Sequence, residues 1–426
     1  MDAASLLKRF FFCEQSLIIS QAGWLAAIAS LEVKLTLPRM LWEDALTADA
    51  LRNRVFELRY PNRLMDTDAG DDASLARVFE AAIDAPGPEA FVLSLTRVFK
   101  PALHQAYRHY LMQSDEIADG PTRRFLRVAA DEKAGQIETL ETMAAEMLDA
   151  SPAARPQAEA WCAALAAQLD ALGGATLDPM PHPRTLAPPP PRTNTFALTE
   201  LPARDPRFHL CRFYWPDILG ADFPYGEGIR LQLRSAVSHL NEVWAVETAG
   251  AILHAFAAAL GWEFVLDAAR WAYDESRHCR MGYERLLGWE FERREMPLGT
   301  YIYDSARGQD PIYRLGMLFF FETKNIGKKA ARIRAFDDYH DSVSRHDMEY
   351  DWADETIHAH YGQRWLRRLL DKRGLAAGQA EAIEAVRVRC ADLVAATVNS
   401  ATPEERAQIR TVAEAMIRKA ETLAVA

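Results

Sequence analysis

Apolar residues recur every three to four positions along most of the chain, and this spacing predicts helices rather than strands. Several amphipathic segments occupy residues 5 to about 150, among them "EAFVLSLTRVFKPALHQAYRHYLMQ" from Glu89. The next helix, "AEAWCAALAAQLDALGG", is predicted to stop at Gly173 and Gly174, because glycine commonly ends helices. From about residue 226 the pattern predicts helices near 228–259, 261–291, 308–336, 343–373, 376–398 and 403–424.

The last of these helices carries a recognisable start signal. Thr402 is placed to cap the helix, Pro403 suits its first turn, and Glu405 can close a capping box with Thr402. The helix is therefore predicted to begin at residue 403.

Residues 178–206 interrupt the helical pattern and are predicted to form a proline-rich linker. This segment holds nine of the chain's 22 prolines, including the run Pro188–Pro191. Successive prolines favour an extended chain, because proline lacks a backbone N–H and fixes its own φ. The sequence thus predicts an all-α protein with one helical domain at 1–177 and a second at 207–426.

Composition and charge narrow the range of partners. The 426 residues can bury a large core, and 49% hydrophobic and 26% charged residues are ordinary for a globular protein. The formal net charge of −11 argues against a broad nucleic-acid surface. We therefore expect a small-molecule substrate and no nucleic-acid partner.

Cysteine usage and the amino terminus favour a cytoplasmic location. Glu14 and Gln15 interrupt the first apolar run, which does not resemble a secretory signal, and no apolar run is expected to span a bilayer. Scattered cysteines without a C-x-x-C pair indicate a reducing compartment and offer no disulfide framework. These cysteines are Cys13, Cys162, Cys211, Cys279 and Cys390.

Two segments of the second domain repeat the motif D-E-x-x-H-x-x-x-G. They are "DESRHCRMG", from Asp274, and "DETIHAHYG", from Asp354. Residues three apart share one face of a helix, so each copy presents a carboxylate and an imidazole to the same point. Iron and manganese accept this mixed ligand set better than calcium does. The repeat therefore predicts a metal site.

A glutamate in an apolar stretch precedes each copy: Glu247 in "AVETAG" and Glu322 in "FFETKN". A carboxylate in such a place is costly to bury unless it is paired or bound to a metal. The order glutamate, E-x-x-H, glutamate, E-x-x-H is found in di-iron and di-manganese carboxylate bundles. Glu242 is a rival to Glu247. The predicted ligands are Glu247, Glu275, His278, Glu322, Glu355 and His358.

This stretch, from about Leu240 to Trp365, resembles the ferritin-like non-haem di-iron carboxylate superfamily. "DESRH" is similar to the D-E-x-R-H text of bacterial multicomponent monooxygenases. The resemblance implies a ferritin-like four-helix bundle with extra C-terminal helices. It also implies a cofactor of two iron ions, or a manganese–iron pair, that reacts with O2.

The resemblance further implies roles for individual carboxylates. Glu275 and Glu355 would bridge the two metals. Each aspartate of the repeats would bind the outer nitrogen of the histidine in the other copy. Asp274 is thus expected on His358, and Asp354 on His278.

Additional residues are weaker candidates. His254, two turns after Glu247, is either a seventh ligand or proton relay, or a core histidine. Asp351, one turn before Glu355, either supplements the site or caps its helix. His346 and His360 are expected to point elsewhere. Trp271 and Tyr361 are expected to line the bundle interior and are candidates for electron transfer.

The predicted function is a di-iron oxidase or oxygenase that uses O2 to hydroxylate, desaturate or N-oxygenate a small organic substrate. An external electron donor is expected, because the sequence contains no flavin or iron–sulfur motif. The alternatives are a ferroxidase or iron-handling protein, and a metal-binding helical scaffold. The added first domain favours a substrate-handling enzyme over a simple iron store.

The first domain has no predicted chemistry of its own. It is expected to cover the bundle or to form a homodimer. The text "AADEKAG", from Ala129, has a glycine where a ligand copy would have histidine. This domain is alternatively a decayed bundle without metal.

Overall fold

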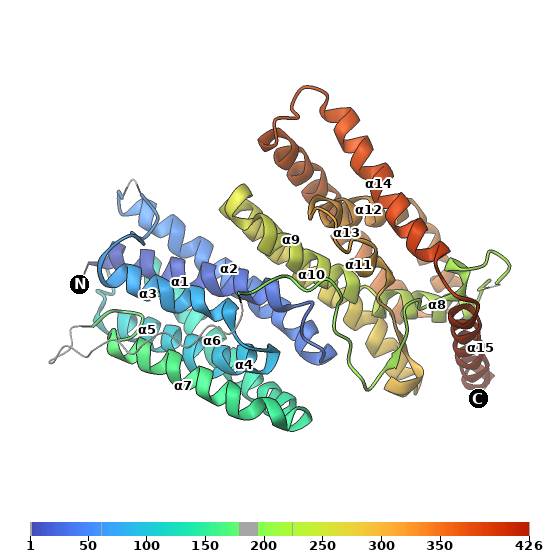
Figure 1. The fold of residues 1–426 in the computed structure, drawn as a ribbon, viewed down its shortest axis with the longest axis horizontal. Helices are drawn as coiled ribbons and strands as arrows, with labels where there is room; N and C mark the ends of the chain where they lie inside the picture. The colour runs from blue at the N-terminus through green and yellow to red at the C-terminus, as the bar shows by residue number, and fades with distance from the viewer. Residues whose placement is uncertain (1, 61, 179–194, 224, 426) are drawn as a thin grey trace. The chain divides into compact units, whose positions relative to one another are not determined.

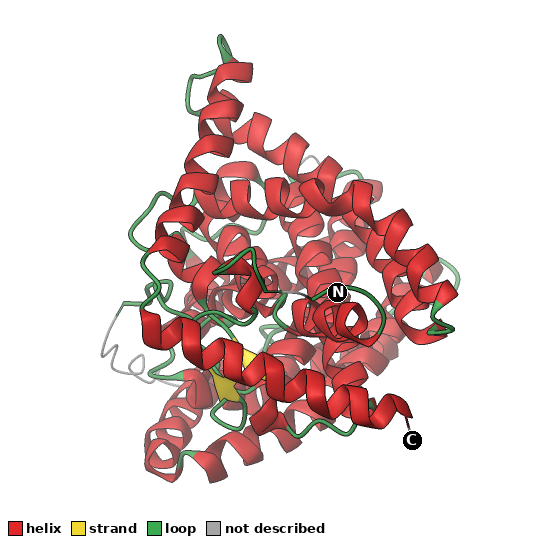
Figure 2. Cartoon of the chain, turned by 90° about the vertical axis from the view of Figure 1, so that its right-hand side faces the viewer, coloured by secondary structure: helices red, strands yellow, loops and turns green. Residues whose placement is uncertain are grey.

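The computed structural model describes the chain apart from residues 1, 61, 179–194, 224 and 426, and apart from the side chains of residues 423–425. Most of the described part is helical, which confirms the predicted all-α class. Two short strands, β1 (His209–Leu210) and β2 (Pro297–Leu298), pair in parallel and are the only strands in the described part (Figure 2). The run Pro188–Pro191 of the predicted linker lies outside the described residues.

The chain divides into two compact units. Unit 1 comprises Met1–Trp24 and Arg39–Ala197, and unit 2 comprises Leu25–Pro38 and Leu198–Ala426. The segment Leu25–Pro38, expected in the first domain, thus belongs to unit 2. Its backbone and side chains contact the segment around residue 204: the Leu31 N–H donates to Asp205 Oδ2 at 3.1 Å.

All regular elements described in unit 1 are helices. A π-helical turn at Leu95–Phe99 leads into α5, and α7 ends before Gly173, whose φ of +83° suits glycine and stops the helix as expected. The helices are α1 (Ala3–Trp24), the later part of α2 (Leu31–Glu57), α3 (Gly70–Glu80), α4 (Pro88–Ser94), α5 (Lys100–Gln113), α6 (Gly120–Ala150) and α7 (Arg155–Ala171).

Unit 2 contains two long helix pairs. Helix α9 packs against α10 and α12, and α13 packs against the same two helices, so the four form a ring of neighbours (Figure 1). Helix α8 covers α10, and α14 covers α12. The helices are α8 (Ile229–Leu240), α9 (Val243–Leu260), α10 (Trp262–Gly288), α11 (Tyr301–Ser305), α12 (Ile312–Asp338), α13 (Ser342–Lys372), α14 (Gln379–Asn399) and α15 (Pro403–Val425).

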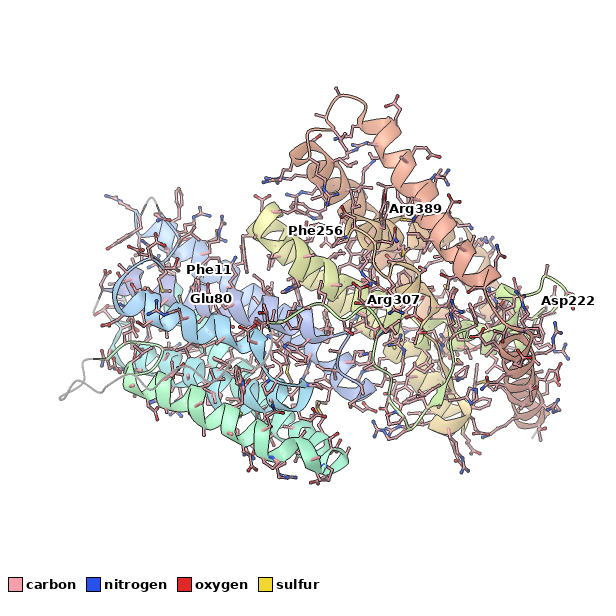
Figure 3. The ribbon with its side chains drawn as sticks, in the orientation of Figure 1. Phe11, Glu80, Asp222, Phe256, Arg307 and Arg389 are labelled. Atoms are coloured by element: carbon pink, nitrogen blue, oxygen red, sulfur yellow. The ribbon has the colours of Figure 1, made fainter. Side chains whose placement is uncertain are left out.

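Local interactions fix the outer helices of unit 2. Arg389, labelled on α14 in Figure 3, donates to Gln309 Oε1 at 3.0 Å, just before α12. At the start of α15 the Glu405 N–H donates to Thr402 Oγ1 at 3.2 Å, and the Thr402 N–H donates to Glu405 Oε2 at 2.8 Å. This reciprocal pair confirms the predicted capping box.

The single helix predicted over 228–259 is broken into α8 and α9. Asn241 holds the turn between them: its amide donates to the Val237 and Pro297 carbonyls at 2.9 and 3.0 Å. Its side-chain oxygen accepts from the Gly299 N–H at 2.7 Å. These bonds tie the turn to β2, and they place Glu242 at the very start of α9.

One stretch, Ile229–Leu260, is long and apolar enough to cross a membrane by length and composition, which the sequence pattern did not lead us to expect. However, 78% of its most apolar window is buried inside the structure. The turn at Asn241 also interrupts it. Burial of this stretch in the protein core therefore accounts for its apolar character.

The glycine that ends each copy of the repeat allows close helix packing. A Cβ at Gly282 would lie 2.2 Å from the backbone nitrogen of Leu240 in α8. A Cβ at Gly362 would lie 2.4 Å from a ring carbon of Phe319 in α12. Larger residues would push the helices apart, so this part of the motif serves packing rather than ligand binding.

Candidate metal centre

The two E-x-x-H pairs face each other from α10 and α13. Glu275 Oε1 lies 3.1 Å from His358 Nδ1, and Glu275 Oε2 lies 3.4 Å from His278 Nδ1. The two imidazole centroids are 6.0 Å apart. One carboxylate thus stands between two histidines, and all three side chains are buried.

The surrounding carboxylates divide this cluster into two overlapping halves. We call Glu275, Glu322 and His358 the His358 half. The His278 half contains His278 and the carboxylates that gather around it, with Asp351 at its edge. Within each set of three, the ligand atoms lie within 4.8 Å of one another. Two of these sets share His278, one with Glu242 and Glu275 and the other with Asp351 and Glu355. We call Glu242, Glu275, His278 and Glu355 the His278 half.

Five of the six predicted ligands meet in this cluster, and Glu247 does not. Glu247 is wholly buried on α9, where Lys34 donates to its Oε1. The Arg204 guanidinium donates to both of its oxygens, at 2.5 and 3.0 Å. Two cations therefore neutralise this carboxylate, so the expectation of a ligand role for Glu247 is corrected: it joins α9 to two distant segments of unit 2.

Glu242 takes the position that was expected of Glu247. Its Oε2 lies 3.4 Å from His278 Nδ1, and its side chain is 22% exposed. In the continuous helix that the pattern predicted, Glu242 would point away from Glu247. The turn at Asn241 removes that constraint and brings the Glu242 carboxylate to the cluster.

The outer nitrogens of both histidines meet aspartates of the opposite copy. His278 Nε2 lies 3.2 Å from Asp354 Oδ2, and His358 Nε2 lies 3.4 Å from Asp274 Oδ2. Both crossed contacts agree with the expectation. They orient each ring so that Nδ1 points into the cluster, as outer carboxylates do for metal-bound histidines.

Two arginines of α10 hold the outer aspartates in place. Arg277 donates to Asp274 Oδ1 at 2.5 Å and lies 3.0 Å from Asp354 Oδ2. Arg270 donates to both oxygens of Asp274. Because Arg277 contacts both aspartates, one arginine serves both copies. The second copy has Ile357 at the corresponding place.

Six inward atoms of the cluster have no hydrogen-bond partner within the described part of the chain. Each comes from a different residue, and five of these residues are more than 90% buried. An unpartnered buried polar atom costs roughly 1–3 kcal/mol, so six at one point require compensation. A pair of cations would supply it. The atoms are Glu242 Oε2, Glu275 Oε2, His278 Nδ1, Glu322 Oε1, Glu355 Oε2 and His358 Nδ1.

The electrostatics also indicate a cluster that accepts positive charge. Burial opposes the charged form of His358, but Asp274 and Glu275 raise its pKa to about 9. Burial likewise opposes ionisation of Glu275, but contacts with the two histidines lower its pKa to about 2. Burial and nearby carboxylates raise the pKa of Glu322 well above its usual value. Protons thus balance the carboxylates here in the way that metal ions can.

Trp271 fixes the carboxylates of the His358 half. Its indole N–H points to Glu275 Oε1 at 3.1 Å and to Glu322 Oε2 at 3.3 Å. The ring stacks on His358 with centroids 5.3 Å apart, and Tyr361 lies 6.1 Å from Trp271. Trp271 is fully buried in the bundle interior, as expected, and Tyr361 is partly buried beside it.

The remaining candidate histidines lie outside the cluster. His254 on α9 belongs to none of the three groups of ligand atoms. His360 points to its own helix, with Nδ1 2.7 Å from the Thr356 carbonyl. His346 is exposed and lies 3.7 Å from Asp347. Asp351, in contrast, is buried and belongs to one of the three groups, with His278 and Glu355.

A cavity of about 630 Å³ opens between α10 and the start of α13. Met281, Trp289 and Val343 supply apolar walls, and Arg277 and Arg285 line it as well. Arg277 also contacts the aspartates behind both histidines. The cavity therefore lies within one helical turn of His278 along α10.

Comparison with known proteins adds one match. A family described as a protein of unknown function, DUF455, matches residues 218–405. The matched stretch includes both copies of the repeat and every residue of the two halves. No curated protein and no solved structure matches the chain.

Proposed function

We propose that α9, α10, α12 and α13 form a ferritin-like bundle around a dinuclear iron centre, and that the protein is an O2-dependent oxidase or oxygenase. The proposal rests on the six unpartnered donor atoms, because four carboxylates and two imidazoles form the ligand set of such centres. The chemistry that two bound iron ions supply is the reduction and activation of dioxygen. A manganese–iron pair would fit the same donors.

Individual residues of the cluster would have distinct roles. Glu275 faces both histidines and would bridge the halves, with Glu355 as a second bridging candidate. Asp274 and Asp354 would fix the tautomers of the histidines. Trp271 would hold Glu275 in place through the hydrogen bond that its indole N–H donates.

The cavity beside α10 favours an organic substrate over iron storage. A volume of about 630 Å³ suits a small molecule, and its walls combine apolar and charged side chains. We place the substrate there. Electrons would come from an external donor. An enzyme that oxidises an organic substrate in this way is an oxidoreductase.

Replacing single glutamates with glutamine tests the proposed ligand set. Full-length protein loaded anaerobically with ferrous iron is expected to hold about two ions per chain. Glu242→Gln should lose the ion of the His278 half, leaving about one, because it removes a charged ligand. Glu247→Gln should keep both ions but unfold more easily, because Arg204 and Lys34 lose their buried counter-charge.

Elemental analysis and thermal unfolding of the two variants give the answer. If Glu247→Gln loses iron and Glu242→Gln retains it, the ligand assignment is reversed. Absence of iron from the anaerobically loaded wild type would remove the basis for the proposed function.

Exposure to oxygen separates an enzyme from an iron store. The ferrous protein should oxidise about two ions per chain and then stop until a reductant is added, because the described residues gather one buried cluster of ligand atoms. Absorbance of ferric iron during titration with excess ferrous iron measures this. Continued oxidation with a soluble mineral product would establish iron storage instead.

A further inference from the structure

Asp351 differs from the six residues with unpartnered atoms, because both of its oxygens are engaged. Lys329 donates to Asp351 Oδ1, and His239 Nε2 lies 3.3 Å from Asp351 Oδ2. Yet Asp351 Oδ1 lies only 3.9 Å from His278 Nδ1. The carboxylate is close enough to reach a cation in the His278 half, but other groups hold it.

Lys329 is a buried cation at the edge of the cluster. It lies on α12, two turns after Glu322, and is 4% exposed. Besides Asp351, its ammonium donates to Glu355 Oε1 at 3.2 Å. Glu355 Oε2 keeps no partner in the described part of the chain, so Glu355 can still offer one oxygen to a metal.

His239 secures the second oxygen of Asp351. Its Nδ1 is contacted by Arg285, which can only donate hydrogen bonds, so Nδ1 accepts. The proton of the neutral ring therefore sits on Nε2 and points to Asp351. Arg285 is fixed in turn by Ser344 at 3.1 Å and Asp347 at 3.2 Å.

The charges assign distinct roles to these groups. Four ligand carboxylates balance two divalent cations. Asp351 adds a fifth negative charge, which Lys329 matches with one positive charge. A buried carboxylate without this partner would be drawn to the nearest cation.

We propose that Asp351 is a reserve ligand that Lys329 withholds from the His278 half. The Lys329–Asp351 ion pair then sets how many carboxylates this half offers, and hence how tightly it holds a divalent cation. This inference rests on the proposed dinuclear centre. It adds one ligand and one regulating cation to that centre.

Cobalt binding to the metal-free full-length chain tests the inference without any substrate. Calorimetry gives the affinity of each half, and the visible absorption of Co²⁺ reports its ligands. Lys329→Met should tighten binding at the His278 half by about tenfold or more, because affinity rises with the number of charged ligands. The Co²⁺ absorption should change as an oxygen ligand is added.

The double variant Lys329→Met, Asp351→Asn is the decisive control. It should return the Kd to within about threefold of the wild type, because the freed carboxylate is no longer present. Lys329→Arg keeps the charge and should behave as the wild type. If Lys329→Met does not fold, Lys329→Gln should show the same tightening.

Two results would overturn the inference. One is unchanged or weaker cobalt binding in the lysine variants, and the other is tightening that persists in the double variant. Failure of the proposed metal centre is distinct from both, because every protein in the series, including the wild type, would then bind no cobalt. Failure of the oxygenase activity alone is detected by exposure of the ferrous protein to oxygen and leaves cobalt binding unchanged.

Discussion

Replacing Glu275 with alanine is expected to abolish binding of both metal ions. Its two oxygens lie 3.1 and 3.4 Å from the inward nitrogens of His358 and His278, so this carboxylate belongs to both halves. Loss of an outer carboxylate typically weakens metal binding by roughly 10–100-fold, and loss of a shared ligand should exceed that range. Elemental analysis and cobalt calorimetry on the full-length variant measure the effect.

Two further variants on the same bundle calibrate this result. Asp354→Ala removes only the group behind His278 and should weaken binding by about 10–100-fold. Glu284→Ala, on the exposed side of α10, should bind metal as the wild type does. If Glu275→Ala retains one ion at wild-type affinity, Glu275 serves one half and does not bridge.

Local geometry made much of this cluster predictable. The E-x-x-H spacing places both side chains on one helical face, and the structure brings the two pairs together. Helical periodicity likewise predicted the all-α class and the long helices of unit 2. These features depend on residues close in sequence, so they can be predicted from the spacing of residues along the chain.

Glu242 lies at the cluster in place of Glu247 because of long-range contacts, which a local sequence pattern cannot reveal. The turn that redirects Glu242 is held by bonds from Asn241 to Pro297 and Gly299. Glu247 is neutralised by Lys34, which arrives from the far end of the chain. An asparagine directly before the glutamate was the one signal of a helix break in the sequence, since asparagine favours turns.

Lys329 illustrates the same limit. In the sequence it belongs to a run of basic residues, Lys324 to Arg334, that reads as a solvated helix face. Its burial follows from the packing of α12 against α13, which places it beside Asp351 and Glu355. Charge runs therefore need tertiary context before their members can be assigned to solvent or core.

Unit 1 has its own buried polar cluster, and lysines occupy it. Asp44 of α2 accepts from Lys100 at 2.8 Å and from Lys133, and Lys133 also donates to Glu14 at 2.9 Å. All four charged side chains are at most 3% exposed. The charges sum to zero, and the described residues of unit 1 contain no group of metal-ligand atoms. Lys133 lies within the segment "AADEKAG". Here lysine ammonium groups therefore balance the charge of the buried carboxylates.

Replacing Asp44 with alanine is expected to destabilise unit 1 by about 3–5 kcal/mol, because it leaves buried ammonium groups without their carboxylate. Asp44 accepts four hydrogen bonds, from Lys100, Lys133, Gln21 and Gln136. Denaturant unfolding of the full chain gives the free energy, and hydrogen exchange localises the loss to α1, α2, α5 and α6.

Glu57→Ala is the matched control on the same helix. Glu57 is 57% exposed and pairs with Arg54 at 3.0 Å, and such surface pairs contribute at most about 1 kcal/mol. Adding Lys100→Met to Asp44→Ala should recover part of the lost stability, because an apolar side chain replaces an unpaired buried charge. A loss below about 1 kcal/mol for Asp44→Ala, or no recovery in the double variant, would show that the lysines find other partners and that this ion cluster does not hold the unit together.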